Sequence, residues 1–157
     1  MSDYNPQTIF LERLSGLDAG ERARLKRSAG QTLGEAREAN FFYRLLPNGV
    51  PEYKEGIYFL VATLYPMAEN MPNGDFGVSL RKARDEKNHK GLDRRVQALL
   101  DSDESQLPFR LRQAVHYLHS RPERVKVNWQ ELLKDLLWWD TVNRPVQRRW
   151  ARNYFAE

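Results

Sequence analysis

Apolar residues recur along this chain at the three- and four-residue spacing of an α-helix. No stretch shows the sustained alternation of apolar and polar residues that a half-buried strand requires. The clearest helical pattern lies between Pro51 and Pro66, and its apolar members are Ile57, Leu60, Val61, Leu64 and Tyr65. Proline favours the first turn of a helix and cannot continue its interior, so Pro51 and Pro66 indicate where this helix begins and ends. Its apolar pattern predicts that it is the central buried helix of the first half.

The remaining apolar clusters predict a series of shorter helices without a sheet. In the first half they cover residues 9–14, a segment from Asp18 toward Ser28, and residues 42–46 before Pro47. In the second half they cover residues 79–87, 92–100, 111–118, 128–137 and a last helix that begins at Pro145. We expect Asp18, Ser79 and Asn128 to cap their helices, since their side-chain oxygens can accept the first free backbone N–H groups. The predicted fold class is therefore all-α.

A segment rich in proline, glycine and asparagine interrupts the helical periodicity at residues 67–77, with the sequence MAENMPNGDFG. Such composition marks a loop between ordered segments. We therefore predict two small helical bundles, at residues 1–66 and 79–157, joined by a linker loop at residues 67–78.

Composition places the chain among folded proteins and removes several kinds of chemistry. Its 157 residues are 41% hydrophobic and 29% charged, which is enough apolar material for a core. The absence of cysteine excludes disulfides, thiol nucleophiles and cysteine-based zinc sites, and it fits a reducing cytoplasm. The longest apolar stretch, residues 57–64, is too short to cross a bilayer, so we expect a cytoplasmic protein.

Positive charge is unevenly distributed along the sequence. The net charge of +4 is weak evidence for a polyanionic partner by itself. Residues 81–95, however, contain seven basic residues against three acidic ones, and the rest of the chain is balanced. This window is the first candidate for contact with nucleic acid.

The C-terminal segment carries a second candidate surface. At 100° per residue, Val146, Trp150, Asn153 and Tyr154 share one side of the predicted helix, and the opposite side carries Arg144, Arg148 and Arg152. Arginines one turn apart stand roughly 6 Å from each other, which is near the spacing of phosphates along a nucleic-acid strand. A solvated helix face is the alternative, but like charges at this spacing repel and no acidic residue lies among them. The stripe therefore favours an anionic partner.

A third basic cluster surrounds Lys26 and Arg27, directly after Arg22 and Arg24. Nearby acidic residues at positions 18 and 21 can neutralise part of it. Surface solvation and phosphate contact are equally good interpretations of this cluster alone. The two other basic regions favour phosphate contact, because arginine forks bind phosphate oxygens in pairs.

Enzymatic interpretations have little support. His116 and His119 stand three residues apart in a predicted helix, but no cysteine or evident third ligand accompanies them, so surface or packing roles are favoured over a metal site. Residues 75–77 spell Asp-Phe-Gly, yet the other kinase motifs are missing and chance explains the match. Trp138 and Trp139 could stack on bases, although at least one of them is expected in the core. We therefore expect neither catalytic residues nor a cofactor.

Several short motifs, in this order and spacing, resemble the CasB family, the small subunits of type I-E CRISPR Cascade surveillance complexes. Their sequences are R-L-K-R at 24–27, F-Y-R-L at 42–45, G-V-S-L at 77–80, D-R-R at 93–95, L-R-Q at 111–113 and N-W-x-x-L-L-x-D-L-L-W-W at 128–139, followed by the arginine-rich final helix. The resemblance covers most of the chain. It implies an all-helical, non-catalytic protein of two small bundles.

The resemblance also implies partners and a nucleic-acid-binding surface. The expected partners are guide RNA, target DNA with its displaced single-stranded non-target strand, the CasC backbone subunits, the large subunit CasA and a second copy of the chain. Neither a membrane nor a small-molecule substrate is expected. In such complexes base pairing supplies sequence specificity, and the protein surface steadies the strands. By position, the expected nucleic-acid contacts are Lys26, Arg27, Arg44, Arg81, Lys82, Arg94, Arg95, Arg110, Arg112, Arg144, Arg148, Arg149 and Arg152.

Two other functions remain open from the sequence. A helix-turn-helix DNA-binding regulator would also be small, helical and basic, but it needs a recognition helix with base-reading side chains, and usually a symmetric dimer. A protein-only adaptor would use its charges for solvation or for acidic subunits. Salt separates these alternatives, because phosphate binding weakens steeply as salt rises.

Overall fold

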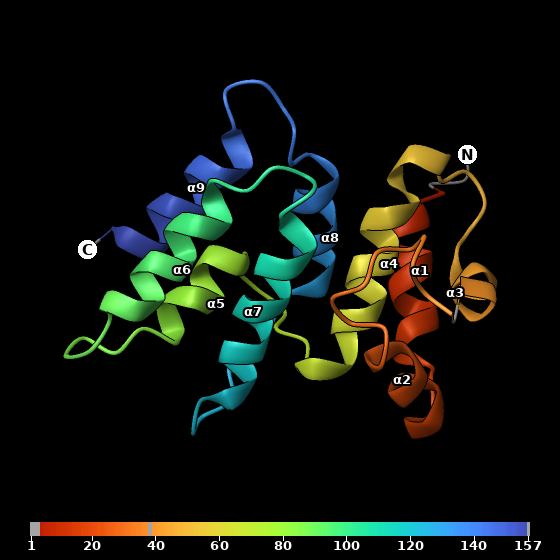
Figure 1. The fold of residues 1–157 in the computed structure, drawn as a ribbon, viewed down its shortest axis with the longest axis horizontal. Coiled ribbons are helices and arrows are strands. Elements are labelled where there is room, and N and C mark those ends of the chain that lie inside the picture. Colours follow the sequence, from red (N-terminus) through yellow and green to blue (C-terminus); the bar gives the residue numbers. More distant parts are fainter. Residues whose placement is uncertain (1–3, 38, 157) are drawn as a thin grey trace.

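A computed structural model describes residues 4–37 and 39–156, and in these residues it contains helices and no strands (Figure 1). The first half holds α1 (Pro6–Ser15), α2 (Ala19–Lys26), α3 (Ala39–Leu45), the 3₁₀ turn η1 (Glu52–Lys54), α4 (Glu55–Leu64) and the 3₁₀ turn η2 (Tyr65–Met67). The second half holds α5 (Phe76–Lys82), α6 (Lys90–Leu100), α7 (Leu107–Ser120), α8 (Trp129–Leu137) and α9 (Pro145–Phe155). The predicted all-α class is confirmed. No helix in the described ranges is long and apolar enough to span a membrane.

Side-chain caps fix where several helices begin. Asp18 accepts a hydrogen bond from the backbone N–H of Glu21, whose own side chain accepts one from the backbone of Asp18. This reciprocal pair satisfies two donors that the first turn of α2 would otherwise leave free. Asn128 caps α8 in the predicted way, and α9 begins at Pro145.

The predicted cap at Ser79 is wrong. Asp75 starts α5 four residues earlier, because its carboxylate accepts a hydrogen bond from the N–H of Val78 at 3.0 Å. Ser79 is buried inside the helix, where its hydroxyl donates to the carbonyl of Lys126 at 2.8 Å. The helix also ends at Lys82 rather than continuing to residue 87.

One connected apolar core runs through both halves of the molecule. Edge-to-face aromatic contacts join Phe10, Phe42 and Phe59 in the first half. Helix α8 lies between the halves and packs on α1 and α4, so the same core cluster continues into the second half (Figure 1). The division into bundles at residues 1–66 and 79–157 with a linker at 67–78 stays a prediction.

The closest helix contact in the second half joins α5 to α9. A Cβ atom on Gly77 would lie 2.6 Å from the backbone carbonyl oxygen of Trp150, which is far below van der Waals distance. Only glycine allows the two backbones to approach this closely. Together with the cap at Asp75, this packing explains two members of the Asp-Phe-Gly sequence without any phosphate chemistry.

Candidate nucleic-acid interface

The arginine stripe on α9 faces solvent. The side chains of Arg148 and Arg152 are exposed and make no hydrogen bond or ion pair within the part of the chain that the structure describes. Arg144 precedes the helix in a left-handed conformation, with φ of 52°, and its guanidinium donates to the carbonyl of Leu100. Two cations of the stripe are therefore free for an anionic partner, and the third is partly engaged by its own chain.

A groove between α6 and α9 borders this stripe. Its volume is about 510 Å³, and it is lined by Gln97, Leu100, Asp101, Asn143, Arg144, Gln147, Arg148, Ala151 and Phe155. Figure 1 shows α6 and α9 side by side at one end of the molecule, and they are in contact. The groove places apolar surface directly beside cationic side chains.

The opposite face of α9 fixes the orientation of the stripe. Val146, Trp150 and Tyr154 are buried, and the indole N–H of Trp150 donates to the carboxylate of Asp135 at 2.9 Å. Because these anchors set the rotation of the helix about its axis, Arg148 and Arg152 must point outward. The predicted division of α9 into a core face and a solvent face is confirmed.

Arg149 has a different environment from its neighbour Arg148. Its guanidinium donates to Asp135 at 3.0 Å and to Asp75 at 2.9 Å, and these carboxylates are 2% and 4% exposed. The hydrogen bonds to Asp135, against the opposing effect of desolvation, raise the pKa of Arg149 above its usual value. A guanidinium held by two buried carboxylates stabilises the contact of α5, α8 and α9, and it has little capacity left for phosphate.

A second polar network joins the end of α9 to α6 and the loop before it. Asp93 accepts hydrogen bonds from Arg84 at 3.1 Å and from the hydroxyl of Tyr154 at 2.5 Å, and it pairs with His89 at 2.6 Å. Desolvation opposes ionisation of Asp93, but these three hydrogen bonds outweigh it and hold its pKa at about 2. Burial and the bond to Asp93 raise the pKa of Tyr154. This network holds α6 against α9, and so supports both walls of the groove.

Four other predicted residues have internal partners. Arg81 donates to the carbonyl of Tyr154 at 2.9 Å, and Arg110 donates to the carbonyl of Ala98 at 2.6 Å. The ammonium of Lys82 lies 3.5 Å from the sulfur of Met71, and the guanidinium of Arg95 lies over the ring of Tyr117 at 5.1 Å. Lys82 and Arg95 are nevertheless exposed, and their charges remain open to solvent.

The remaining predicted residues are exposed but do not form one surface. Lys26, Arg27, Arg44, Arg94 and Arg112 have no hydrogen bond or ion pair among the described residues. Arg94 lies on α6, which borders the groove, whereas Arg44 lies on α3 at the other end of the molecule (Figure 1). The side chain of Arg112 packs over Gly30, at 2.8 Å from the position of a Cβ there. This contact brings α7 close to the turn that follows α2, near Lys26 at the end of the helix and Arg27 directly after it.

The tryptophan pair divides as expected between core and surface. Trp139 is 2% exposed and donates its indole N–H to the carbonyl of Ser102, while Trp138 is 58% exposed. The ammonium of Lys54 lies 5.9 Å from the ring of Trp138. Of the histidines considered for metal binding, His116 is exposed, and within the described ranges no three His, Cys, Asp or Glu residues gather as a metal site.

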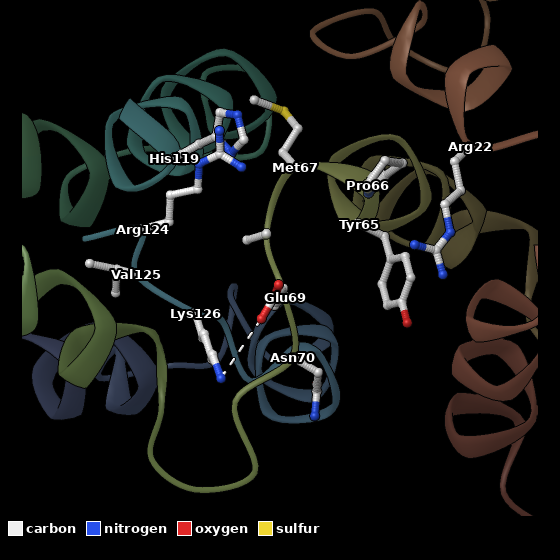
Figure 2. Close-up of a pocket in the computed structure, with 11 residues that line it drawn as sticks. Arg22, Tyr65, Pro66, Met67, Glu69, Asn70, His119, Arg124, Val125 and Lys126 are labelled. Carbon is white, nitrogen blue, oxygen red and sulfur yellow. Dashed lines mark ion pairs between the residues drawn. The ribbon is translucent and has the colours of Figure 1, made fainter. Parts of the chain in front are cut away.

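A cationic cavity between the two halves was not predicted from the sequence. Figure 2 shows Arg22 beside Tyr65 on one side, Arg124 beside His119 on the other, and Lys126 paired with Glu69 between them. The basic sequence around Arg124 and Lys126 was a usable signal, but it belongs to no predicted helix and lies 102 residues from Arg22.

These features define an all-helical protein with cationic outer faces. The family model for CRISPR-associated protein Cse2 matches residues 21–155. The Cse2 protein of Thermus thermophilus is 34% identical over 153 residues, which cover 94% of this chain and 86% of that protein.

Solved structures agree with the sequence match. The crystal structure of CasB from M. ruber is 27% identical and superposes with a TM-score of 0.78, over 96% of this chain and 93% of that one. A chain of a CRISPR RNA-guided surveillance complex is 25% identical with a TM-score of 0.76, over 94% and 90% of the two chains. The chain therefore belongs to the CRISPR-associated Cse2 family, also known as CasB, and the resemblance found in the sequence is confirmed.

Proposed function

We propose that this protein is a non-catalytic small subunit of a CRISPR RNA-guided DNA surveillance complex of type I-E Cascade. Its cationic surfaces steady the guide RNA paired with target DNA and hold the displaced non-target strand in antiviral defence. Membership of the Cse2 family and the likeness to a chain of a surveillance complex support the assembly. Guide RNA, target DNA, CasC, CasA and a second copy of the chain are the proposed partners, in the cytoplasm.

The single observation that carries the nucleic-acid role is the pair of unpartnered arginines on α9. Arg148 and Arg152 stand one helical turn apart, with no acidic partner among the described residues. Strand exchange in such complexes is nearly balanced, because the heteroduplex that forms is about as stable as the DNA duplex it replaces. A small electrostatic contribution to the displaced strand is therefore enough to shift the balance.

The predicted residues are proposed to contribute unequally to nucleic-acid binding. The free side chains of Lys26, Arg27, Arg44, Arg94, Arg112, Arg148 and Arg152 are proposed to make the main contacts, supported by Lys82 and Arg95. The internal partners of Arg81, Arg110 and Arg144 leave them part of their hydrogen-bonding capacity. Arg149 is proposed to act through the stability of the α5–α8–α9 packing.

Binding of the full chain to labelled single-stranded DNA, duplex DNA and guide RNA across a salt series tests the role. If the subunit binds phosphates, the logarithm of its affinity falls linearly with the logarithm of the salt concentration, and the affinity does not depend on base sequence. A helix-turn-helix regulator would instead prefer one duplex sequence. A protein-only adaptor would bind none of the three at low salt, and that result would refute the proposed function.

A further inference from the structure

The cavity between the two halves of the chain is cationic and preorganised. Its volume is about 470 Å³, and its lining includes Arg22, Arg124, Lys126 and His119 against the single carboxylate of Glu69. Arg22 comes from α2 in the first half, whereas Arg124 and Lys126 follow α7 in the second half. A ligand in this cavity would therefore contact both halves of the molecule (Figure 2).

Backbone hydrogen bonds hold two walls of the cavity together. The N–H of Val127 donates to the carbonyl of Glu69 at 2.9 Å, and the N–H of Met71 donates to the carbonyl of Val127 at 2.8 Å. This short parallel bridge keeps the segment of Lys126 beside the segment of Glu69. Because these walls are already fixed, a ligand does not have to order them, and less of its interaction energy is lost to ordering the site.

Arg22 contains a buried donor without an acceptor. Its guanidinium lies over the ring of Tyr65 at 5.9 Å, and among the described residues its Nε is buried with no hydrogen-bond partner. Buried polar groups in native proteins nearly always have partners, so this N–H indicates a site that an acceptor completes. A ligand with several acceptor oxygens satisfies that requirement.

The one carboxylate in the lining binds its lysine weakly. The ammonium of Lys126 lies 3.7 Å from Glu69, and the two side chains are 56% and 85% exposed. An exposed pair at this distance contributes little to stability, so Lys126 can exchange Glu69 for another anion at small cost. The side chain of Arg124 is exposed and has no hydrogen bond or ion pair in the described part of the chain.

We propose that this cavity binds a backbone phosphate of a single-stranded nucleic acid, with Arg22 on one side and Arg124 and Lys126 on the other. The inference rests on the proposed function and adds a second contact region to the α9 stripe. Arginine forks match phosphate oxygens, and the volume suits a nucleotide-sized group. A flexible single strand can direct one phosphate into a concave site, whereas a duplex keeps its phosphates on a stiff convex surface.

Removing the acidic residue gives a test in which binding becomes tighter. In Glu69→Gln, the affinity of the full chain for a fluorescein-labelled thymidine oligonucleotide rises about threefold, the effect of removing the repulsion between unit charges about 6 Å apart in water. Glu12→Gln is the matched control, because it changes net charge equally at an exposed position on α1, outside the cavity and outside the basic window at residues 81–95. Equal gains in the two variants would overturn the inference.

Removing cations gives the complementary test. The double variant Arg124→Gln/Lys126→Gln flattens the slope of log affinity against log salt by about 0.7, the value for one lost phosphate contact of a single strand. The control Arg37→Gln/Lys134→Gln loses the same charge at exposed positions that line neither the cavity nor the groove and lie outside the basic window at residues 81–95. Circular dichroism melts confirm that all four chains fold.

A local measurement separates this inference from the proposed function. The oligonucleotide protects Lys126 from acetylation, measured by mass spectrometry, and leaves the exposed Lys134 reactive. If the unaltered chain binds DNA but Lys126 stays reactive and both double variants have equal slopes, the cavity assignment fails and the α9 role stands. If the unaltered chain binds no nucleic acid at low salt, the proposed function itself fails. Inorganic phosphate that protects Lys126 as well as the strand does would refute a site for a nucleic-acid strand.

Discussion

Adjacent arginines on α9 have different environments, and one substitution at each position separates their contributions to stability. Arg149→Met removes the guanidinium that pairs with Asp75 and Asp135, while retaining a long unbranched side chain. Both carboxylates are almost fully buried, so the substitution leaves two buried negative charges without a cationic partner, held only by their remaining neutral donors. Breaking one side of a buried pair costs about 3–5 kcal/mol. Because the Arg149 side chain is 40% exposed, water relieves part of that penalty and we expect about 3 kcal/mol.

Urea denaturation followed by tryptophan fluorescence measures the free energy of unfolding. A loss of about 3 kcal/mol lowers the melting temperature of a chain of this size by about 6–12 °C. Arg148→Met is the matched control, since it is exposed and unpartnered, and its stability should change by less than about 0.5 kcal/mol. If the two variants unfold at the same urea concentration, the buried ion pairs do not stabilise the α5–α8–α9 contact and the reasoning is wrong.

Three further predictions concern stability. The pKa of Asp93 is depressed to about 2, so its ionised form contributes about 2 kcal/mol at neutral pH, and that contribution disappears as pH falls from about 4 to 2. Asp93→Asn should therefore be less stable than the unaltered protein at pH 7, and a stability difference that stays constant down to pH 2 would contradict the assignment. Gly77→Ala forces a methyl group against the Trp150 carbonyl and should cost about 1–3 kcal/mol in urea unfolding, with an unchanged midpoint as the contrary result. Gly91→Ala, which meets open space near the start of α6, should match the unaltered protein or exceed its stability by about 0.5–1 kcal/mol, and a loss in a thermal melt would show that the site is not open.

Most helices could be predicted from the sequence because they bury a stripe of regularly spaced apolar residues, whereas α2, whose one buried residue is Leu25, was located by its cap. The caps at Asp18 and Asn128 follow from the same local logic. The cap at Ser79 was predicted because a serine before an apolar run is typical of a cap. In the structure the helix begins earlier, where Asp75 accepts a hydrogen bond from the N–H of Val78. Local patterns cannot show that the carbonyl of Lys126, 47 residues away, accepts from the Ser79 hydroxyl.

The candidate interface shows the same division between local and distant information. Helical periodicity predicted that Arg148 and Arg152 face away from the core, and both are exposed. It could not identify the partners of Arg149, because Asp75 lies 74 residues earlier in the chain. The cavity was missed for the same reason, since the fold alone brings Arg22 close to the segment of Arg124 and Lys126.

The central claim is that α9 holds nucleic acid. It is tested most directly by the lifetime, in the assembled surveillance complex, of the R-loop, the structure in which guide RNA pairs with target DNA and the non-target strand is displaced. The chain with Arg148→Glu and Arg152→Glu should fold normally by circular dichroism and shorten the R-loop lifetime, because the stripe would then repel the displaced strand. The effect should diminish at high salt, where charges on the surface are screened. A folded, correctly assembled variant with an unchanged R-loop lifetime would contradict the claim that α9 holds nucleic acid.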